Sequence, residues 1–294
     1  MKKLFFIVSL VMLFAFSSVQ AKDLTLGLSL STLNNPFFVT LKEGAMKQAN
    51  VSGVKLVVTD SQDNPATEAK NIEDLIIKKV DALLINPTDS SAIAPSVFKA
   101  NKAGIPVFTV DRSANSGNVV AHVASDNVAG GVMAGEFLIK KINGKGKVVE
   151  LEGIAGSSAA VDRGKGFNQV VSKNSGVTVV AKQTANFNRA EGLRVFENIL
   201  QAQPDIDGVF AHNDEMILGA IQAAKASGRS KGIVFVGFDA VDDAVNAVNA
   251  GDLEATVAQQ PAVIGELGVK TAVDYLNGKS VQQNIPVPLS LVSK

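Results

Sequence analysis

The sequence predicts an α/β protein built of two similar doubly wound parallel-sheet lobes joined by a multi-strand hinge. Three observations lead to this prediction. Short apolar segments alternate with longer segments of helical periodicity along the chain. Most of the short segments end in polar side chains. The two halves also echo each other, since Asp81–Asn86 resembles Asp207–Asn213 and Val107–Asp111 resembles Val234–Asp239.

The first half of the chain predicts five strands separated by helices. The expected strands are Leu24–Leu30, Val54–Thr59, Ala82–Ile85, Ile105–Val110 and Val119–Ala124. The expected helices are Val39–Asn50, Ala66–Lys79 and Ser90–Ala103. The fourth strand is short, apolar and rich in β-branched residues, which is typical of a strand buried on both faces. It ends in the opposite charges Asp111 and Arg112.

The same alternation begins again near residue 129. The expected strands are Val148–Leu151, Val177–Ala181, Gly208–Ala211, Ile233–Gly237 and Leu253–Ala258. We expect helices at Ala129–Ile142, around Arg163, up to Gln201 and after Glu215. Strands that alternate with helices favour βαβ units and a parallel sheet, with helices on both faces.

The N-terminal residues are typical of a secretory signal peptide. Two lysines precede the apolar run Leu4–Phe16, and small residues follow up to Ala21. The run is shorter than the roughly 20 residues that a membrane span needs. We therefore predict a signal peptide at residues 1–21, cleavage after Ala21, and a mature protein in a bacterial periplasm. The chain has no cysteine, which excludes disulfides and a lipid anchor on cysteine.

The repeated pattern also predicts how the chain divides. Polar stretches at Val123–Asn127 and Ala258–Gln260 are the expected passages between the lobes, and Pro286–Pro288 is a third. We expect one lobe at 22–125 plus 260–288, and the other at 126–259 plus 289–294.

The composition limits the classes of partner. Hydrophobic residues make up 46% of the chain and charged residues 19%, so the protein fills real cores and is not disordered. Lys and Arg together number 28, as do Asp and Glu, and this balance argues against nucleic acid because phosphate binding needs a basic excess.

The candidate site consists of side chains at or just beyond the strand ends, together with Arg163 near the start of a helix. Strand ends of doubly wound lobes meet at one crevice, where ligands bind. The candidates are Ser31, Asn35, Phe37, Phe38, Asn86, Asp111, Arg112, Arg163, Phe187, Asn213, Phe238, Asp239 and Gln259. Their donors and acceptors match the vicinal hydroxyls of a sugar, and phenyl rings can cover its C–H faces. Two acids balance two arginines, which favours a neutral ligand.

Nothing in the sequence favours catalysis, a cofactor or a metal. We interpret the two histidines, His122 and His212, as structural. No nucleophile elbow, zinc spacing or phosphate-binding lysine motif occurs. The stretch Gly153–Gly156 lacks the full dinucleotide fingerprint, and Asp60–Asn64 lacks the glycine and terminal glutamate of a calcium-binding loop.

Taken together, these motifs resemble those of the periplasmic ribose-binding proteins, within the wider pentose/hexose-binding family of type I periplasmic binding proteins. The matching segments are Ser31–Phe38, Leu84–Asp89, Val110–Arg112, Gly153–Gly156 with Arg163-Gly164, Ala211–Met216, Val236–Asp239 and Ala258-Gln259. The resemblance covers essentially the whole mature chain. His212 and Gln260 depart from the pattern, and Gln260 lies beside an expected passage between the lobes.

The resemblance implies a monomeric protein that closes its two lobes around one β-D-ribose and delivers it to an ATP-driven inner-membrane importer. Some members also engage a chemotaxis receptor. By position, Phe37 and Phe187 would sandwich the sugar ring, and Phe38 and Phe238 would complete the apolar wall. The polar candidates would bind the hydroxyls and the ring oxygen.

Three alternatives remain open at this stage. One is another neutral sugar such as allose or galactose, although the absence of Trp argues mildly against galactose. A second is a sugar-responsive repressor, but a signal peptide stands where its DNA-binding segment would be. A third is an exported enzyme, which turnover of ribose would reveal.

Overall fold

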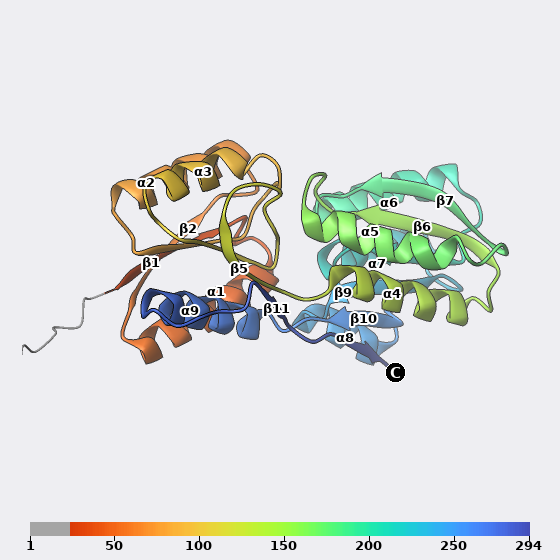
Figure 1. Ribbon diagram of the computed structural model, residues 1–294. Helices are drawn as coiled ribbons and strands as arrows, with labels where there is room; N and C mark the ends of the chain where they lie inside the picture. Colours follow the sequence, from red (N-terminus) through yellow and green to blue (C-terminus); the bar gives the residue numbers. More distant parts are fainter. Residues whose placement is uncertain (1–23) are drawn as a thin grey trace, which may run out of the picture.

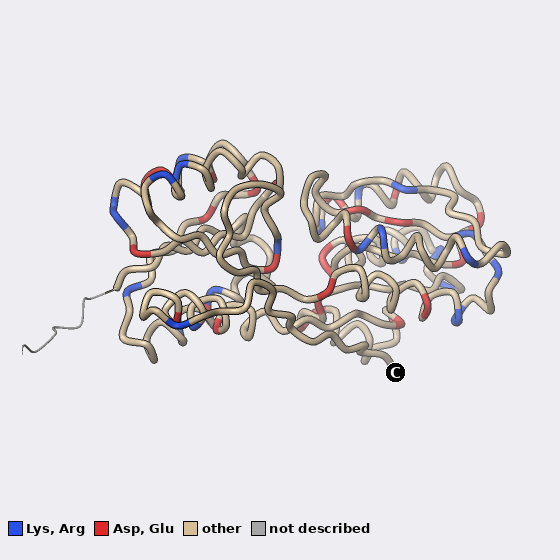
Figure 2. Tube along the Cα trace, viewed as in Figure 1, with Lys and Arg blue, Asp and Glu red and all other residues tan. Residues whose placement is uncertain are grey.

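The computed structural model describes residues 24–294 and confirms the predicted α/β class. The predicted signal peptide and its cleavage point lie outside the described residues. The described chain forms two six-stranded sheets that stand side by side, each with helices on both faces (Figure 1). Acidic and basic residues are interspersed over both halves (Figure 2). No helix of residues 24–294 is long and apolar enough to cross a membrane.

The first sheet has the strand order β11-β5-β4-β3-β1-β2, and all its pairings are parallel. Its strands are β1 (Thr25–Leu30), β2 (Lys55–Asp60), β3 (Ala82–Ile85), β4 (Val107–Val110), β5 (Val119–Ala124) and β11 (Asn284–Pro286). Its helices are α1 (Pro36–Ser52), α2 (Pro65–Ile77), α3 (Ala94–Lys102) and α9 (Pro261–Leu276). Helices α2 and α3 cover one face, and α1 and α9 cover the other (Figure 1). We call this unit the first lobe.

The second sheet has the order β12-β10-β9-β8-β6-β7, in which only β12 runs antiparallel. Its strands are β6 (Gly146–Glu152), β7 (Val177–Thr184), β8 (Gly208–Ala211), β9 (Val234–Asp239), β10 (Ala255–Ala258) and β12 (Ser290–Ser293). Its helices are α4 (Asn127–Lys141), α5 (Ser158–Val171), α6 (Arg189–Ala202), α7 (Asp214–Ala226) and α8 (Asp242–Ala250). We call this unit the second lobe.

The chain passes between the lobes after β5, after β10 and after β11. The last strand of each sheet is therefore supplied by the C-terminal segment, because β11 pairs with β5 and β12 pairs with β10. The residue bounds that we predicted for the two lobes stay a prediction. Helices α8 and α9 and strands β11 and β12 are not among the elements that we expected from the sequence.

One predicted helix is shorter in the structure. We expected a helix from Ser90, but α3 begins at Ala94. The backbone of Ser90 is engaged elsewhere, because its N–H donates to the Gly156 oxygen at 3.0 Å and its oxygen accepts from Asn115 at 2.7 Å. These bonds prevent Ser90 from entering a helical turn.

A close contact between α4 and α5 sets the position of the predicted site residue on α5. A Cβ atom on Gly131 would collide with the backbone oxygen of Arg163, and one on Gly166 would collide with that of Val128. Only glycine at both positions permits the two backbones to approach this closely. Arg163 is thereby held against the start of α4.

Candidate functional site

A small cavity lies between the two lobes, at the ends of strands from both sheets. The centre of a water-sized sphere has only about 10 Å³ of it to move in, roughly what one water molecule needs, so side chains fill most of the cavity. Its lining consists of Asn35, Phe37, Phe38, Asp111, Arg112, Ala159, Arg163, Phe187, Asn213 and Asp239. Nine of these ten are sequence candidates, and Ala159 is the residue that the sequence argument missed.

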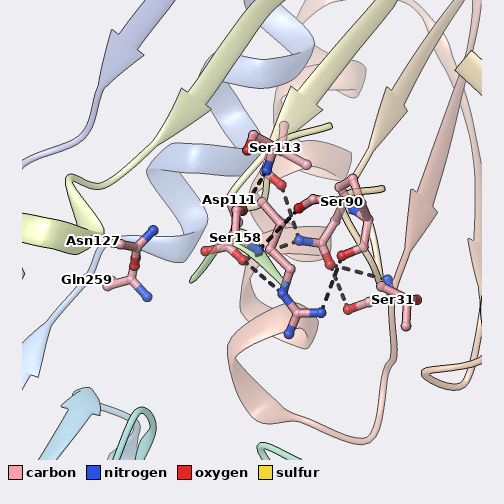
Figure 3. Close-up of polar contacts among 12 residues, drawn as sticks. Ser31, Ser90, Asp111, Ser113, Asn127, Ser158 and Gln259 are labelled. Carbon is pink, nitrogen blue, oxygen red and sulfur yellow. Dashed lines mark hydrogen bonds and ion pairs between the residues drawn. The ribbon is translucent and has the colours of Figure 1, made fainter. Parts of the chain in front are cut away.

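The other four candidates lie directly behind this lining. Ser31 donates through Oγ to Asn86 Oδ1 at 2.7 Å, and Asn86 donates through Nδ2 to Asp111 Oδ2 at 3.2 Å (Figure 3). Gln259 donates through Nε2 to Asp239 Oδ1 at 2.9 Å. Phe238 is fully buried beneath Arg163. These four residues hold cavity residues in place.

Asp111 and Arg112 form the charged wall of the first lobe. Asp111 has a φ of 62°, a conformation that non-glycine residues rarely adopt, and Asn86 and Arg112 hold its carboxylate there. The Arg112 Nε lies 3.8 Å from Asp111 Oδ2. Asp111 Oδ1 and Arg112 Nε are buried and have no hydrogen-bond partner among the described residues, so one acceptor and one donor are open to a ligand.

Burial dominates the electrostatics of this pair. Loss of water raises the pKa of Asp111, and the charge of Arg112 opposes this rise. Loss of water likewise lowers the pKa of Arg112, and Asp111 opposes this fall. Each charge therefore depends on the other, and a site with one of them removed would carry an unpaired buried charge.

Aromatic rings supply the apolar walls. The Arg112 guanidinium carbon lies 5.1 Å from the ring centroids of both Phe38 and Phe187. Phe37 meets Phe38 edge to face, with centroids 5.2 Å apart and planes at 89°. The ring of Phe187 packs directly on Gly153, where any Cβ atom would collide with it. The absence of a side chain at Gly153 therefore leaves the space that this ring occupies.

Arg163 and Asp239 form the charged wall of the second lobe. Arg163 donates through Nε to Asn127 Oδ1 at 2.8 Å and through Nη1 to the His212 oxygen at 2.6 Å. Its guanidinium carbon lies 3.8 Å from the Phe238 centroid. Asp239 Oδ1 lies 3.5 Å from Arg163 Nη1. Burial raises the pKa of Asp239 to about 7, and the charge of Arg163 opposes the rise.

Two asparagines combine capping with placement at the cavity. Asn35 precedes α1, and its Oδ1 accepts from the N–H of Phe37 at 2.9 Å. Asn213 caps α7, where its Oδ1 accepts from the N–H of Met216 at 3.0 Å. Asn213 also donates through Nδ2 to the Phe187 oxygen at 3.2 Å. Each helix start thus fixes one cavity side chain.

Neither histidine lines the cavity. His122 Nδ1 lies 2.8 Å from Thr109 Oγ1. His212 is fully buried, with Nε2 at 3.0 Å from Glu150 Oε1 and Nδ1 accepting from the N–H of Gly153 at 3.4 Å. Burial lowers the pKa of both imidazoles.

Direct hydrogen bonds between the lobes flank the cavity. The N–H of Ser158 on α5 donates to Ser90 Oγ at 3.1 Å, and the N–H of Ser113 donates to Ser158 Oγ at 2.9 Å (Figure 3). With the bond from Ser90 to the Gly156 oxygen, they form what we call the serine seam (Ser90, Ser113, Gly156 and Ser158). The sequence argument did not find it, nor the contact of Asn127 with Arg163. Small polar residues near turns carry no signal of a distant partner.

The site as a whole suits a small neutral polyol. Two carboxylates and two guanidinium groups balance, rings from both lobes cover apolar faces, and buried polar atoms remain for hydroxyl groups. Within residues 24–294 no cluster of three or more histidine, cysteine or acidic side chains is arranged to hold a metal ion.

Comparisons with known proteins agree with this geometry. A family model described as a periplasmic binding protein domain matches residues 26–280. The ribose import binding protein of Escherichia coli is 52% identical over 296 residues, which cover 100% of this chain and 99% of the relative. That of Haemophilus influenzae is 51% identical over 295 residues and 100% of both chains.

A solved structure is also closely similar. It is an ABC transporter periplasmic solute binding protein from Actinobacillus succinogenes with bound D-allose. The TM-score is 0.86 and the sequence identity 30%, and the match covers 92% of this chain and 98% of that one.

Proposed function

The chain belongs to the periplasmic binding protein domain family, and from this premise we propose that it captures D-ribose between its two lobes and delivers it to an ATP-driven inner-membrane sugar importer. The observation that carries the proposal is the convergence of two acid–arginine pairs and the Phe rings on one cavity. These residues come from strand ends that lie up to about two hundred positions apart in the chain.

The proposed roles of the residues follow from their placement. Asp111, Arg112, Arg163 and Asp239 bind hydroxyl groups through charge-assisted hydrogen bonds. The rings of Phe37 and Phe187 cover the two faces of the sugar. Ser31, Asn86, Phe238 and Gln259 support this set from behind.

Binding is coupled to closure of the lobes. A ligand that contacts both lobes stabilises the closed state by its differential affinity for that state. We propose hinge movement about the three interlobe passages, with lobes at 22–125 plus 260–288 and 126–259 plus 289–294. The importer then distinguishes loaded from empty protein by its shape.

The remaining features of the proposal concern the protein's location and partners. The protein is exported to the periplasm with its signal peptide removed after Ala21, acts as a monomer, and releases its sugar unchanged. A chemotaxis receptor that reads the closed form is a further proposed partner. N-terminal sequencing of the exported protein tests the cleavage, and recovery of unchanged ribose after stoichiometric binding tests the absence of turnover.

A second candidate ligand is D-allose, because the similar structure from A. succinogenes holds that sugar. Calorimetric titration of the purified mature protein with ribose, allose, galactose, arabinose and xylose separates the candidates. We expect ribose to bind with one site per chain and the highest affinity. Tighter binding of allose than of ribose would reassign the ligand, and absence of binding to all five sugars would refute the proposal.

A further inference from the structure

We propose that Asp214 is a positioning residue that holds the turn after β9 in a strained conformation and so directs the Asp239 carboxylate into the cavity. Asp214 itself does not line the cavity, and its own side chain is fully buried. The inference rests on the proposed function only in taking Asp239 as a ligand-binding residue.

The turn after β9 is strained at two consecutive positions. Asp239 has a φ of 119° and Ala240 a φ of 57°, and neither is a glycine. L-residues rarely adopt positive φ, and the value at Asp239 lies outside the small left-handed region that they tolerate. Such a conformation persists only where neighbouring groups hold it.

Asp214 supplies these restraints. Its Oδ2 accepts from the N–H of Val241 at 2.9 Å, and its Oδ1 accepts from Thr256 Oγ1 at 2.7 Å. The same Thr256 hydroxyl oxygen accepts from the N–H of Ala240 at 3.1 Å. The Asp214 carboxylate therefore binds the N–H of Val241 directly and holds the N–H of Ala240 through Thr256.

A glycine makes this arrangement possible. A Cβ atom on Gly237 would collide with Asp214 Oδ1 and would meet Ile217 Cγ2 at 2.9 Å. Thr256 pairs with Gly237 across the β9–β10 ladder, so the hydroxyl and the carboxylate meet beside a strand residue without a side chain. Gly237 thus leaves the space through which Asp214 reaches the turn.

The result of these restraints is the placement of Asp239. Its Oδ1 accepts from Gln259 Nε2 at 2.9 Å and lies 3.5 Å from Arg163 Nη1. A second carboxylate so near is electrostatically unfavourable, since burial and the charge of Asp239 raise the pKa of Asp214 well above its usual range. The bonds that Asp214 makes to the turn after β9 explain why a second carboxylate is buried at this unfavourable position.

The test is the variant D214N, titrated with the sugar that the wild type binds most tightly. The amide keeps the shape of the carboxylate, but its nitrogen cannot accept a hydrogen bond. D214N therefore loses either the bond from the N–H of Val241 or the bond from the Thr256 hydroxyl. We expect a loss of affinity of about tenfold or more in a folded protein. Affinity within about twofold of wild type would overturn the inference.

A double-mutant cycle separates positioning from general destabilisation. In a D239N background, D214N should change affinity by less than about twofold, because its effect acts through Asp239. An equal loss in both backgrounds overturns the inference. The control is E254Q, since Glu254 Oε2 accepts from the N–H of Phe235 at 2.6 Å near the other end of β9. We expect E254Q to bind the sugar as tightly as the wild type. A loss of affinity equal to that of D214N would mean that weakening β9 in general causes the loss, and this would overturn the inference.

Two further measurements keep the inference testable if a variant or the function fails. Should D214N not fold, T256V removes the bond to the N–H of Ala240 with little change in volume, and the same affinity criterion applies. If the wild type binds none of the sugars, the proposed function fails separately. The crystal structure of D214N then decides, because the inference requires Asp239 and Ala240 to leave positive φ, and an unchanged turn overturns it.

Discussion

The guanidinium carbon of Arg112 lies 5.1 Å from the ring centroid of Phe187, although the two residues belong to different lobes. Phe38 of the first lobe lies at the same distance from that carbon, so the charge is enclosed by rings from both sides. A cation–π contact between buried groups contributes up to about 2 kcal/mol. Arg112 therefore serves both as part of the cavity wall and as a contact that favours closure.

Replacing Arg112 with lysine tests this double role. Lysine keeps the charge but loses the planar group that lies between the rings, so we expect R112K to weaken ribose binding by about 1–2 kcal/mol. Calorimetry measures the effect. The matched control is R194K, since Arg194 is exposed and, among residues 24–294, pairs only with Glu191. Equal affinities of R112K and the wild type would show that ribose binding does not depend on the planar guanidinium group between the rings.

Removal of one charge from either acid–arginine pair should largely abolish binding. We expect D111A and R163A each to cost about 1.5–3 kcal/mol for the lost bond to the sugar, with a further penalty for the buried partner left unpaired. Titration with ribose measures both variants. D274A, which removes a partly exposed carboxylate far from the cavity lining and paired with two lysines, is the control. Near-wild-type affinity in both D111A and R163A would refute the site assignment.

Much of the fold and the cavity lining followed from periodicity, whereas the supporting contacts did not. Asp111 and Asp239 stand directly after apolar residues, and Asn213 stands one residue beyond the apolar strand β8. Doubly wound topology brings such positions together whatever the details of packing. Asn127 shows the limit, since it bonds Arg163 from 36 residues away and by sequence is only the end of the expected passage Val123–Asn127. Its partner depends on how closely α4 and α5 approach, and that distance is set by glycines on both helices.

The serine seam should contribute to closure without any ligand. Changing Ser90 and Ser158 to alanine removes the acceptors for the N–H groups of Ser158 and Ser113, at about 0.5–1.5 kcal/mol for each bond. The open state gains population as a result, and ribose dissociates faster from S90A/S158A. Small-angle scattering of the free protein and stopped-flow release measure the two effects.

The control for the seam is S172A, because Ser172 lies at the end of α5 and its hydroxyl donates to the Gln169 oxygen of the same helix. An unchanged scattering profile together with an unchanged release rate in S90A/S158A would contradict the prediction. It would mean that the bonds of the serine seam form when the lobes close but do not stabilise the closed state.

Glu68 should make the stability of the protein depend on pH. Its side chain is 1% exposed, and burial raises its pKa from 4.5 to about 7, while the N–H of Thr88 opposes the rise by donating to both carboxylate oxygens. Between about pH 4.5 and 7 the folded protein therefore holds this proton and the unfolded chain releases it. The free energy of unfolding then falls as the pH rises through this window, by at most about 1.4 kcal/mol per pH unit.

The variant E68Q cannot titrate at this position, so its free energy of unfolding should fall less steeply than that of the wild type over the same window. Burial raises the pKa of Asp239 as well, so a smaller slope remains in the variant. Urea unfolding at pH 5, 6 and 7 gives the profiles, and E73Q, which changes an exposed carboxylate of the same helix, is the control. Parallel profiles for E68Q and the wild type would show that Glu68 has the same proton affinity in the folded and unfolded states, because only a difference between these affinities makes stability vary with pH.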